Sequence, residues 1–244
     1  MWYNPTLTRI SAIKARSLPK RCIKDDPREN SLQLYLRFNE GNGRIVFDYS
    51  KYKRHGIIYN TNWGKNSVDR GLWFNGINSY VQTPSFALTG TAISILDWVN
   101  FRTQSFTQTL LNKNYRNGPL GYLWLYRVAA TEGLTFEYAT ASTWASKAAD
   151  SFFSGYNDRY VFVSVTCDYQ NKILKFYRNG QIHTTYDITD TMIFPSANTV
   201  CYIGSYQGSQ LFFKGVIDDV GLYNRMLTDQ EIRMIYENEK DNYR

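Results

Sequence analysis

Apolar and polar residues alternate with a period of two along much of the chain after residue 30. Residues 32–38 and 161–167 show the alternation clearly, so that every second side chain can face a core. Runs rich in Val, Ile, Tyr, Phe and Trp recur between Gly and Asn turns, which indicates β-strands. We predict strands over 32–38, 79–83, 92–100, 107–111, 122–127, 134–138, 160–168, 173–177, 181–186, 200–205 and 213–223.

Asn-Gly pairs mark the turns, since both residues readily adopt the positive φ angles of tight hairpins. They stand at Asn75-Gly76, Asn117-Gly118 and Asn179-Gly180. The last pair joins two alternating runs and predicts the most secure hairpin of the chain.

One helix is clearly signalled, near the C-terminus. Thr228 and Glu231 have the spacing of a capping box, in which each side chain bonds the other residue's backbone amide. Leu227 and Ile232 flank the box and can close a hydrophobic staple. This pattern predicts a helix beginning just after Thr228.

The composition favours one large β-domain. The 244 residues include 20 Tyr, 14 Phe and 6 Trp, and aromatic side chains suit pleated, half-buried surfaces. No apolar run approaches the roughly 18 residues that span a bilayer. We therefore predict an all-β, two-sheet antiparallel sandwich over residues 31–244, with one short C-terminal helix and no transmembrane segment.

Residues 1–30 form a basic N-terminal arm. They carry seven Lys or Arg and three Asp or Glu, so the arm holds +4 of the net charge of +7. Three interpretations stay open: an organelle transit peptide, an arm that docks on an acidic partner or nucleic acid, and a solvated tail. Residues 1–21 lack the apolar region of a secretory signal peptide, so conventional secretion is not signalled. The basic residues before the first acidic one are Arg9, Lys14, Arg16, Lys20, Arg21 and Lys24.

The three cysteines show no metal-ligand spacing. Cys22, Cys167 and Cys201 form no CxxC pair, and the two histidines lie far apart in sequence, which argues against a zinc site. Buried free thiols are the simplest interpretation. A Cys167–Cys201 disulfide is the alternative.

Several short motifs, in order, resemble the laminin-G-like domains. They include LYLRFNEGNG at 34–43, GLWFNGINSYV at 71–81, KFYRNG at 175–180, YIGS at 202–205 and FKGVIDDVGLYNRMLT at 213–228. The resemblance covers about residues 31–238. It implies a concanavalin A-like jelly roll, a fold that hosts lectins and some glycoside hydrolases and does not by itself name a function.

The hydrolases of this fold carry two glutamates five residues apart on one strand, with an aspartate two residues after the first. Glu132 and Glu137 have the outer spacing, but Leu134 stands at the middle position and Gly133 indicates a turn. We expect no enzymatic activity. The two remote histidines also leave little basis for a nucleophilic triad.

The resemblance further implies one structural calcium ion. Asp218 stands at the matching place, with backbone carbonyls near Gly71 and a residue near Glu40 as further oxygen ligands. The alternative is that Asp218 caps a turn or pairs with a lysine. The loop after the Trp-Phe strand carries Asn75 and Asn78 where relatives are rich in aspartate, which argues against a second, sugar-binding calcium.

Glycan binding needs aromatic platforms and planar hydrogen-bonding groups. Trp98 and Trp124 lie within predicted strands and Trp73 lies in the Trp-Phe strand of the motif at 71–81, so all three are expected in the core. The candidate ligand-binding residues lie in predicted loops and are Trp63, Asn114, Tyr115, Arg116, Trp144 and Tyr206.

These features lead to a functional expectation. The chain is expected to be a non-catalytic jelly-roll protein that is a structural or attachment component of a larger assembly. A viral particle is the leading candidate for that assembly. The arm would contact other protein subunits, and the body would contact glycans. A free carbohydrate-binding lectin and an accessory subunit of an organellar complex are the alternatives. Nucleic-acid binding is not expected for the body, because no basic stripe with interleaved aromatics is evident.

Overall fold

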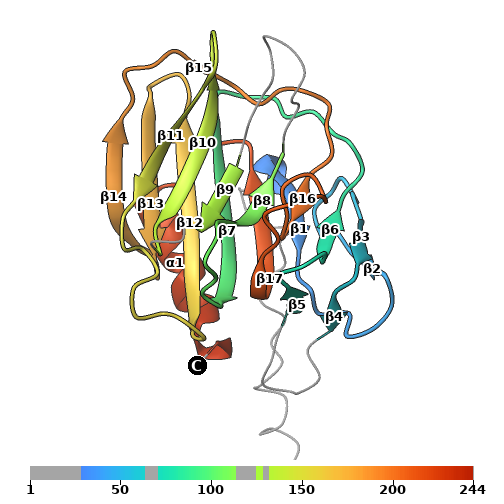
Figure 1. The fold of residues 1–244 in the computed structure, drawn as a ribbon. Coiled ribbons are helices and arrows are strands. Elements are labelled where there is room, and N and C mark those ends of the chain that lie inside the picture. The colour runs from blue at the N-terminus through green and yellow to red at the C-terminus, as the bar shows by residue number, and fades with distance from the viewer. Residues whose placement is uncertain (1–28, 64–70, 114–124, 129–131, 244) are drawn as a thin grey trace, which may run out of the picture.

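Two antiparallel β-sheets lie face to face in the computed structural model, which describes residues 29–63, 71–113, 125–128 and 132–243 (Figure 1). Sheet A has the order β14 (Gln181–Asp187), β13 (Ile173–Arg178), β12 (Tyr160–Asp168), β7 (Ala92–Phe101), β17 (Lys214–Tyr223), β5 (Leu72–Asn75) and β4 (Asn62–Trp63), with β1 (Leu32–Leu36) also on β17. Sheet B has the order β11 (Trp144–Ala149), β10 (Leu134–Thr140), β9 (Leu125–Val128), β8 (Gln108–Asn112), β16 (Tyr202–Ile203), β6 (Tyr80–Gln82), β3 (Gly56–Tyr59) and β2 (Ile45–Val46), with β15 (Met192–Ile193) on β10.

The predicted alternation places one face of each strand in the core between the sheets. On β12, Val161, Val163 and Val165 belong to this core, while Phe162 packs in a second cluster on the opposite face of sheet A. Apolar side chains from both sheets fill the space between them and leave water, which is the main stabilising contribution to a sandwich. The all-β jelly-roll class with one short C-terminal helix is thereby confirmed.

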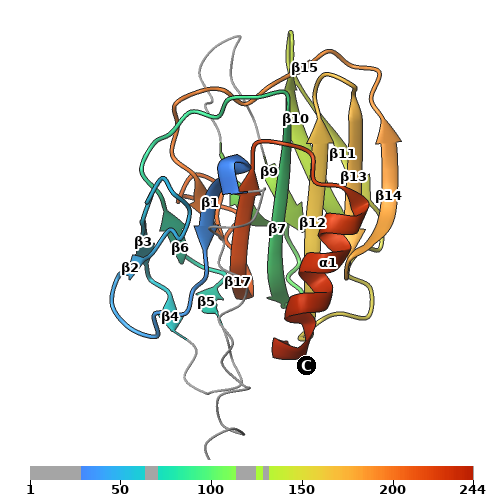
Figure 2. The same cartoon turned by 180° about the vertical axis from the view of Figure 1, so that it is seen from behind.

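Helix α1 (Asp229–Glu239) covers the outer face of sheet A (Figure 2). Ile232 and Ile235 are buried in the second cluster, together with Trp98 and Phe162 from the strands beneath. Two short 3-10 helices, η3 (Glu29–Ser31) and η4 (Lys240–Asn242), lie before β1 and after α1.

The capping box is confirmed. The Thr228 hydroxyl accepts a hydrogen bond from the Glu231 amide at 3.2 Å, and the Glu231 carboxylate accepts one from the Thr228 amide at 2.9 Å. Leu227 and Ile232 are both buried in the same cluster, as the predicted staple requires.

One Asn-Gly hairpin is confirmed and one behaves differently. Asn179 and Gly180 have φ angles of 51° and 75°, and they connect β13 to β14 in a two-residue turn. Asn75 and Gly76 instead connect β5 of sheet A to β6 of sheet B, and the Asn75 side chain accepts hydrogen bonds from two amides of the turn. That turn therefore passes between the sheets and closes no hairpin. Asn117-Gly118 lies outside the described residues.

The alternative prediction of a Cys167–Cys201 disulfide is wrong. Cys167 and Cys201 are both buried and free, one on β12 of sheet A and the other just before β16 of sheet B. Burial raises the pKa of the Cys201 thiol to about 12 and that of Cys167 well above its ordinary value.

Cys22 and all six basic arm residues named in the sequence analysis lie outside the described part of the chain. Among the residues that are described, no helix has the length and apolar character needed to cross a membrane.

Candidate functional site

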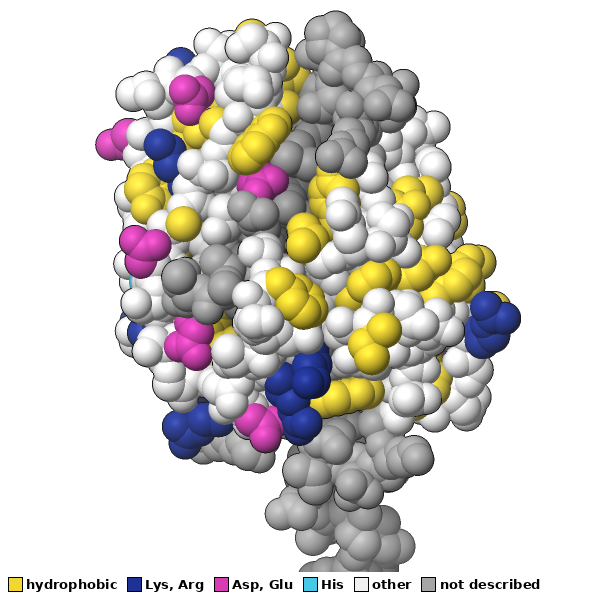
Figure 3. All heavy atoms as spheres, viewed as in Figure 1, with side chains coloured by type: hydrophobic (Ala, Val, Ile, Leu, Met, Phe, Trp, Pro, Cys, Tyr) yellow, Lys and Arg dark blue, Asp and Glu magenta, His cyan; other side chains and the backbone are white. Residues whose placement is uncertain are grey.

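The outer face of sheet B differs from that of sheet A, because no helix of the described chain lies on it (Figure 1). Hydrophobic side chains gather there over β16, β6, β3 and β2 (Figure 3). The strands β3, β6 and β16 of this region carry Tyr59, Tyr80, Gln82 and Tyr202, which we call the tyrosine face.

Strand periodicity directs these four side chains outward. Ile58, Val81 and Ile203 point into the core, so their neighbours along each strand point the other way. The strand register pairs Tyr59 with Tyr80 and Tyr202 with Gln82. Three adjacent strands therefore bring three phenols and one amide onto a single rigid surface.

The rings form a continuous row. Tyr59 and Tyr80 are stacked, with centroids 4.6 Å apart and planes 13° from parallel. The Tyr202 ring follows at 6.1 Å from that of Tyr80, and the guanidinium of Arg44 lies 6.0 Å from the Tyr59 centroid. Since Tyr59 and Tyr80 stack face to face, this pair offers mainly its ring edges and hydroxyl groups to a ligand.

A turn supports the row from one end. Gly208 has a φ of +67°, and a Cβ there would lie 3.0 Å from Cζ of Tyr80 and 3.3 Å from Cε1 of Tyr202. The turn therefore packs closely against both rings and restricts their movement. Tyr206 at the start of the same turn is itself buried, with 8% of its surface exposed.

The polar groups of the tyrosine face are available for binding. The hydroxyls of Tyr59, Tyr80 and Tyr202 and the amide of Gln82 make no hydrogen bond with any residue that the structure describes. Burial, with a smaller contribution from neighbouring tyrosines, raises the pKa of Tyr80 and of Tyr202. Both phenols are therefore neutral at physiological pH, and each can donate and accept a hydrogen bond.

The structure does not bring the predicted loop residues together. Trp63 lies on β4 at an end of sheet A, packs against the core and donates from Nε1 to the Gly43 carbonyl at 2.9 Å. Trp144 lies on β11 at an end of sheet B and is 56% exposed. Asn114, Tyr115 and Arg116 fall outside the described residues, so a role for them in binding stays a prediction.

The tryptophans expected in the core divide into different environments. Trp98 is buried with 3% exposure, under α1 rather than between the sheets. Trp73 is half-buried on β5, and the guanidinium of Arg102 lies 4.6 Å from its ring. Trp124 lies in a part of the chain that is not described.

Sequence reasoning missed the tyrosine face, although a signal for it was present. The segment Tyr80-Val81-Gln82 alternates polar and apolar positions, and so does Tyr202-Ile203. That alternation alone places Tyr80, Gln82 and Tyr202 on an outer face. It does not reveal that β6 and β16 are neighbours.

The two spaced glutamates are not on one strand. Glu132 lies in a bend before β10 with a φ of 60°, as the neighbouring glycine indicated. Glu137 lies within β10 and is 4% exposed. The geometry of a paired acid and nucleophile on one concave strand is not present.

Asp218 belongs to a buried carboxylate pair on β17. The Tyr243 hydroxyl lies 2.7 Å from Oδ2 of Asp218 and 2.7 Å from Oδ2 of Asp219. One hydroxyl hydrogen serves only one of these acceptors, so the other contact requires a proton on the carboxyl group. Burial, and next the charge of Asp219, raises the pKa of Asp218 well above its ordinary value.

This arrangement bears on the expected calcium ion. The Tyr243 hydroxyl occupies the space between the two carboxylates, and the Arg37 guanidinium lies 3.9 Å from Asp219. Gly71 does approach Asp218, since a Cβ on Gly71 would lie 2.9 Å from that of Asp218. Within the described residues no group of three or more His, Cys, Asp or Glu side chains is placed to hold a metal ion. Calcium at Asp218 stays a prediction.

Comparison with solved structures supports the fold. The receptor-binding domain of botulinum neurotoxin mosaic serotype C/D superposes with a TM-score of 0.68 at 14% identity, over 87% of this chain and 52% of that one. The serotype D ligand-binding domain in complex with N-acetylneuraminic acid gives 0.66 at 16% identity, over 86% and 52%. The serotype G binding domain gives 0.63 at 16% identity, over 84% and 50%. The chain thus spans about half the length of these neighbours.

Sequence comparison gives the family. No curated protein matches the chain. A family model described as the concanavalin A-like lectin/glucanases superfamily matches residues 75–233, which is more than half of the sequence and spans most of both sheets. The resemblance drawn from the short motifs is confirmed, and the chain belongs to the concanavalin A-like lectin/glucanase superfamily.

Proposed function

We propose that this chain is a non-catalytic carbohydrate-binding domain whose ligand lies on the tyrosine face. The observation that carries the proposal is the set of three phenols and one amide on adjacent strands, all without a hydrogen-bond partner in the described chain. Sugars offer many hydroxyl groups, which neutral phenols and amides can both donate to and accept from. Phenol rings add apolar edges beside these polar groups.

The comparisons support the same class of function. A neighbouring structure of this fold was obtained with N-acetylneuraminic acid, although in a chain about twice as long. The separation of Glu132 from the strand that carries Glu137 favours binding over glycoside hydrolysis.

A glycan array with the full chain, with and without calcium, tests the proposal. Hits are then measured by calorimetry on Tyr80→Phe and Tyr202→Phe, which keep the rings and remove only the hydroxyls. Each lost hydrogen bond is expected to weaken binding about three- to tenfold. Trp144→Ala is the control, because Trp144 is exposed and lies on β11, apart from the face.

The outcomes separate the candidate surfaces. If Trp144→Ala abolishes binding and the tyrosine variants do not, the ligand lies near β11 and the tyrosine face is not the site. A blank array under both conditions contradicts carbohydrate binding on the tyrosine face.

We also propose that the chain is a structural or attachment component of a larger assembly, such as a viral particle, with the basic arm as its contact to other subunits. The concentration of +4 of the +7 net charge in residues 1–30 supports this proposal. Sedimentation and native mass of the full chain are compared with a form beginning at Ser31. Assembly of the full chain alone supports the arm as a contact; two monomers contradict it.

A further inference from the structure

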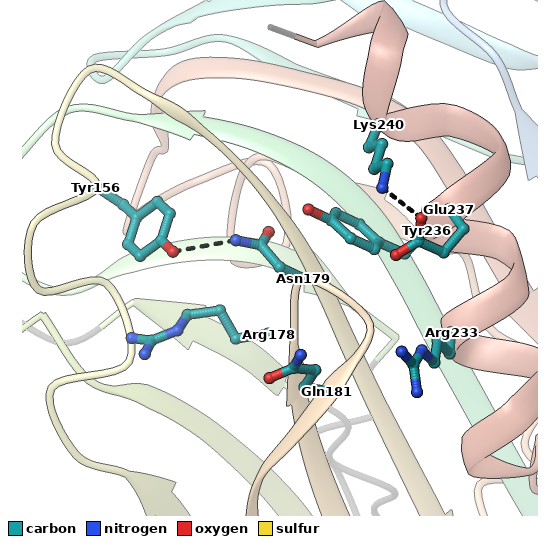
Figure 4. Close-up of a pocket in the computed structure, with 8 residues that line it drawn as sticks. All are labelled: Tyr156, Arg178, Asn179, Gln181, Arg233, Tyr236, Glu237 and Lys240. Atoms are coloured by element: carbon teal, nitrogen blue, oxygen red, sulfur yellow. Dashed lines mark hydrogen bonds and ion pairs between the residues drawn. The ribbon is translucent and has the colours of Figure 1, made fainter.

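A polar cavity lies beside α1 on the outer face of sheet A, whereas the tyrosine face lies on sheet B. It has a volume of about 340 Å³ and sits where the β13–β14 turn meets α1 and the connection between β11 and β12 (Figure 4). Arg233 lines it from α1 and Lys240 from the start of η4, and Arg178 and Tyr156 line the opposite wall.

The walls of this cavity are held in place without a ligand. Oδ1 of Asn179 accepts from the Phe162 amide, and its Nδ2 donates to the Tyr156 hydroxyl, both at 3.0 Å. Gly180 rests directly on the helix, since a Cβ there would lie 2.9 Å from Cβ of Tyr236. The turn and α1 therefore form one preorganised frame, which lowers the entropy lost on binding.

The charge in the cavity is predominantly positive. Three cationic side chains, Arg178, Arg233 and Lys240, line it together with a single acidic one, Glu237, so the formal balance is +2. Lys240 pairs with Glu237. Arg233 is exposed and makes no hydrogen bond or ion pair with any other described residue. One guanidinium is therefore left to attract an anion.

The other wall adds further donors. Nη1 of Arg178 donates to the Phe152 carbonyl at 2.8 Å, and the guanidinium lies 5.3 Å from the Tyr156 ring centroid. The hydroxyl of Tyr156 accepts from Asn179, so its own hydrogen is available to a ligand. The space between the walls is larger than a free inorganic ion needs, and it suits a single ring with polar substituents.

We propose that this cavity binds an acidic sugar residue, with its carboxylate or sulfate group on Arg233 and its ring hydroxyls toward Tyr156 and Arg178. The inference rests on the proposed carbohydrate binding, to which it adds a second site and a charge preference. Arginine is the expected residue for such a group, because its planar fork matches carboxylate and sulfate oxygens.

The test uses pairs of sugars that differ by one acidic group at C6. Binding to the full chain is measured by calorimetry and ligand-observed NMR for glucuronic acid against glucose, and for N-acetylglucosamine 6-sulfate against N-acetylglucosamine. Inorganic sulfate is measured separately. The acidic sugars are expected to bind at least about tenfold more tightly than their neutral partners, and to weaken as salt is added.

Two variants locate the site. Arg233→Gln should weaken the acidic probes about tenfold, since it removes the unpaired guanidinium without breaking a described contact. Lys53→Gln, which removes one exposed positive charge near β3, should leave them unchanged.

Several results overturn the inference. Equal binding of acidic and neutral sugars, no effect of Arg233→Gln, or inorganic sulfate binding as tightly as the sulfated sugar each contradicts it. Tyr80→Phe separates this failure from that of the tyrosine face, because it should not change binding of the acidic monosaccharides. If the acidic monosaccharides bind, but the glycan array gives no hit and Tyr80→Phe changes no affinity, the cavity proposal stands and the tyrosine face is rejected as a binding site.

Discussion

Both sheets carry aromatic side chains on their outer faces, but those of sheet A are buried under a helix and those of sheet B are not. On sheet A the Tyr177 hydroxyl donates to Asp229 of α1 at 2.7 Å, and its residue is fully buried under the helix. On sheet B the Tyr80 side chain is half-buried, and its hydroxyl is without a partner among the described residues. The difference is the helix. An aromatic strand face that is covered contributes stability, and one that is left uncovered can contribute binding.

The comparison predicts its largest effect at Trp98. Trp98→Ala removes a ring that contacts Phe162, Tyr236 and Tyr243, and it should lower the free energy of unfolding by about 3–5 kcal/mol. Urea unfolding measures the change. Trp144→Ala, at an exposed position, should change it by less than about 0.5 kcal/mol. Similar losses in the two variants would contradict the division into covered and uncovered aromatics.

The attachment of the helix itself predicts a smaller effect. Hydrogen bonds from Arg225 lower the pKa of Glu231 to about 2, and the Thr228 amide adds to this. Glu231→Gln should cost about 1–2 kcal/mol at neutral pH. Because the folded pKa is lowered, the contribution of Glu231 is complete above pH 4.5 and is lost as the pH falls toward 2.

Chemical unfolding at several pH values tests this. The gap between wild type and Glu231→Gln should close on acidification. Asp187→Asn, which removes an exposed carboxylate from the end of β14, is the control and should show no such gap. A gap that is constant from pH 7 to pH 2 would show that the ionised carboxylate is not what holds the cap.

The buried carboxylates Asp218 and Asp219 predict the opposite effect on stability: removing the charge of one of them should stabilise the fold. The folded pKa of Asp218 is raised, so its stabilising contribution is lost as the pH rises through that value. Asp218→Asn keeps a donor for Tyr243 and removes the ionisation. The variant should be more stable than wild type by about 1 kcal/mol at neutral pH and should lose this advantage near pH 4.

Calcium binding at Asp218 can be tested with the same variant. If calcium binds at Asp218, added calcium should raise the Tm of wild type and leave that of Asp218→Asn unchanged. Equal response of the two proteins would remove Asp218 from any calcium site.

The smallest effect on stability is expected on the uncovered face. Tyr80→Phe removes a hydroxyl that has no partner in the described structure, so the free energy of unfolding should change by less than about 0.5 kcal/mol. A glycan found to bind the wild type should nevertheless be bound less tightly. A large loss of stability would show that the hydroxyl serves the fold, and the comparison between the faces would then fail.

Much of the fold followed from local signals. The long strands, the Asn179-Gly180 turn and the Thr228 cap each depend on periodicity, backbone angles or short-range hydrogen bonds, all of which are written in neighbouring residues. The short strands β2, β3, β4 and β15 were missed, because two to four residues carry little periodicity and only pairing defines such strands. Strand β11 (Trp144–Ala149) was missed because Ala and Ser dominate its sequence, and neither residue favours strands.

The site was less accessible to sequence reasoning. Trp63 and Trp144 were chosen because aromatic residues in loops suggest platforms, but both lie on strands, at ends of different sheets. Tyr206 was chosen for the same reason and is buried in a turn against its neighbours. Exposure depends on what packs above a residue, and residues distant in sequence supply that cover.

The sequence by itself determined the sandwich, its one capped helix and its family, because strand periodicity, turn angles and capping are short-range properties. Only the tertiary structure decided which aromatic face became core. Helix α1 lies on sheet A, whereas adjacent strands of sheet B align Tyr59, Tyr80 and Tyr202 with no helix of the described chain above them. The physical reason is that burial is set by long-range packing, which cannot be read from the local order of residues.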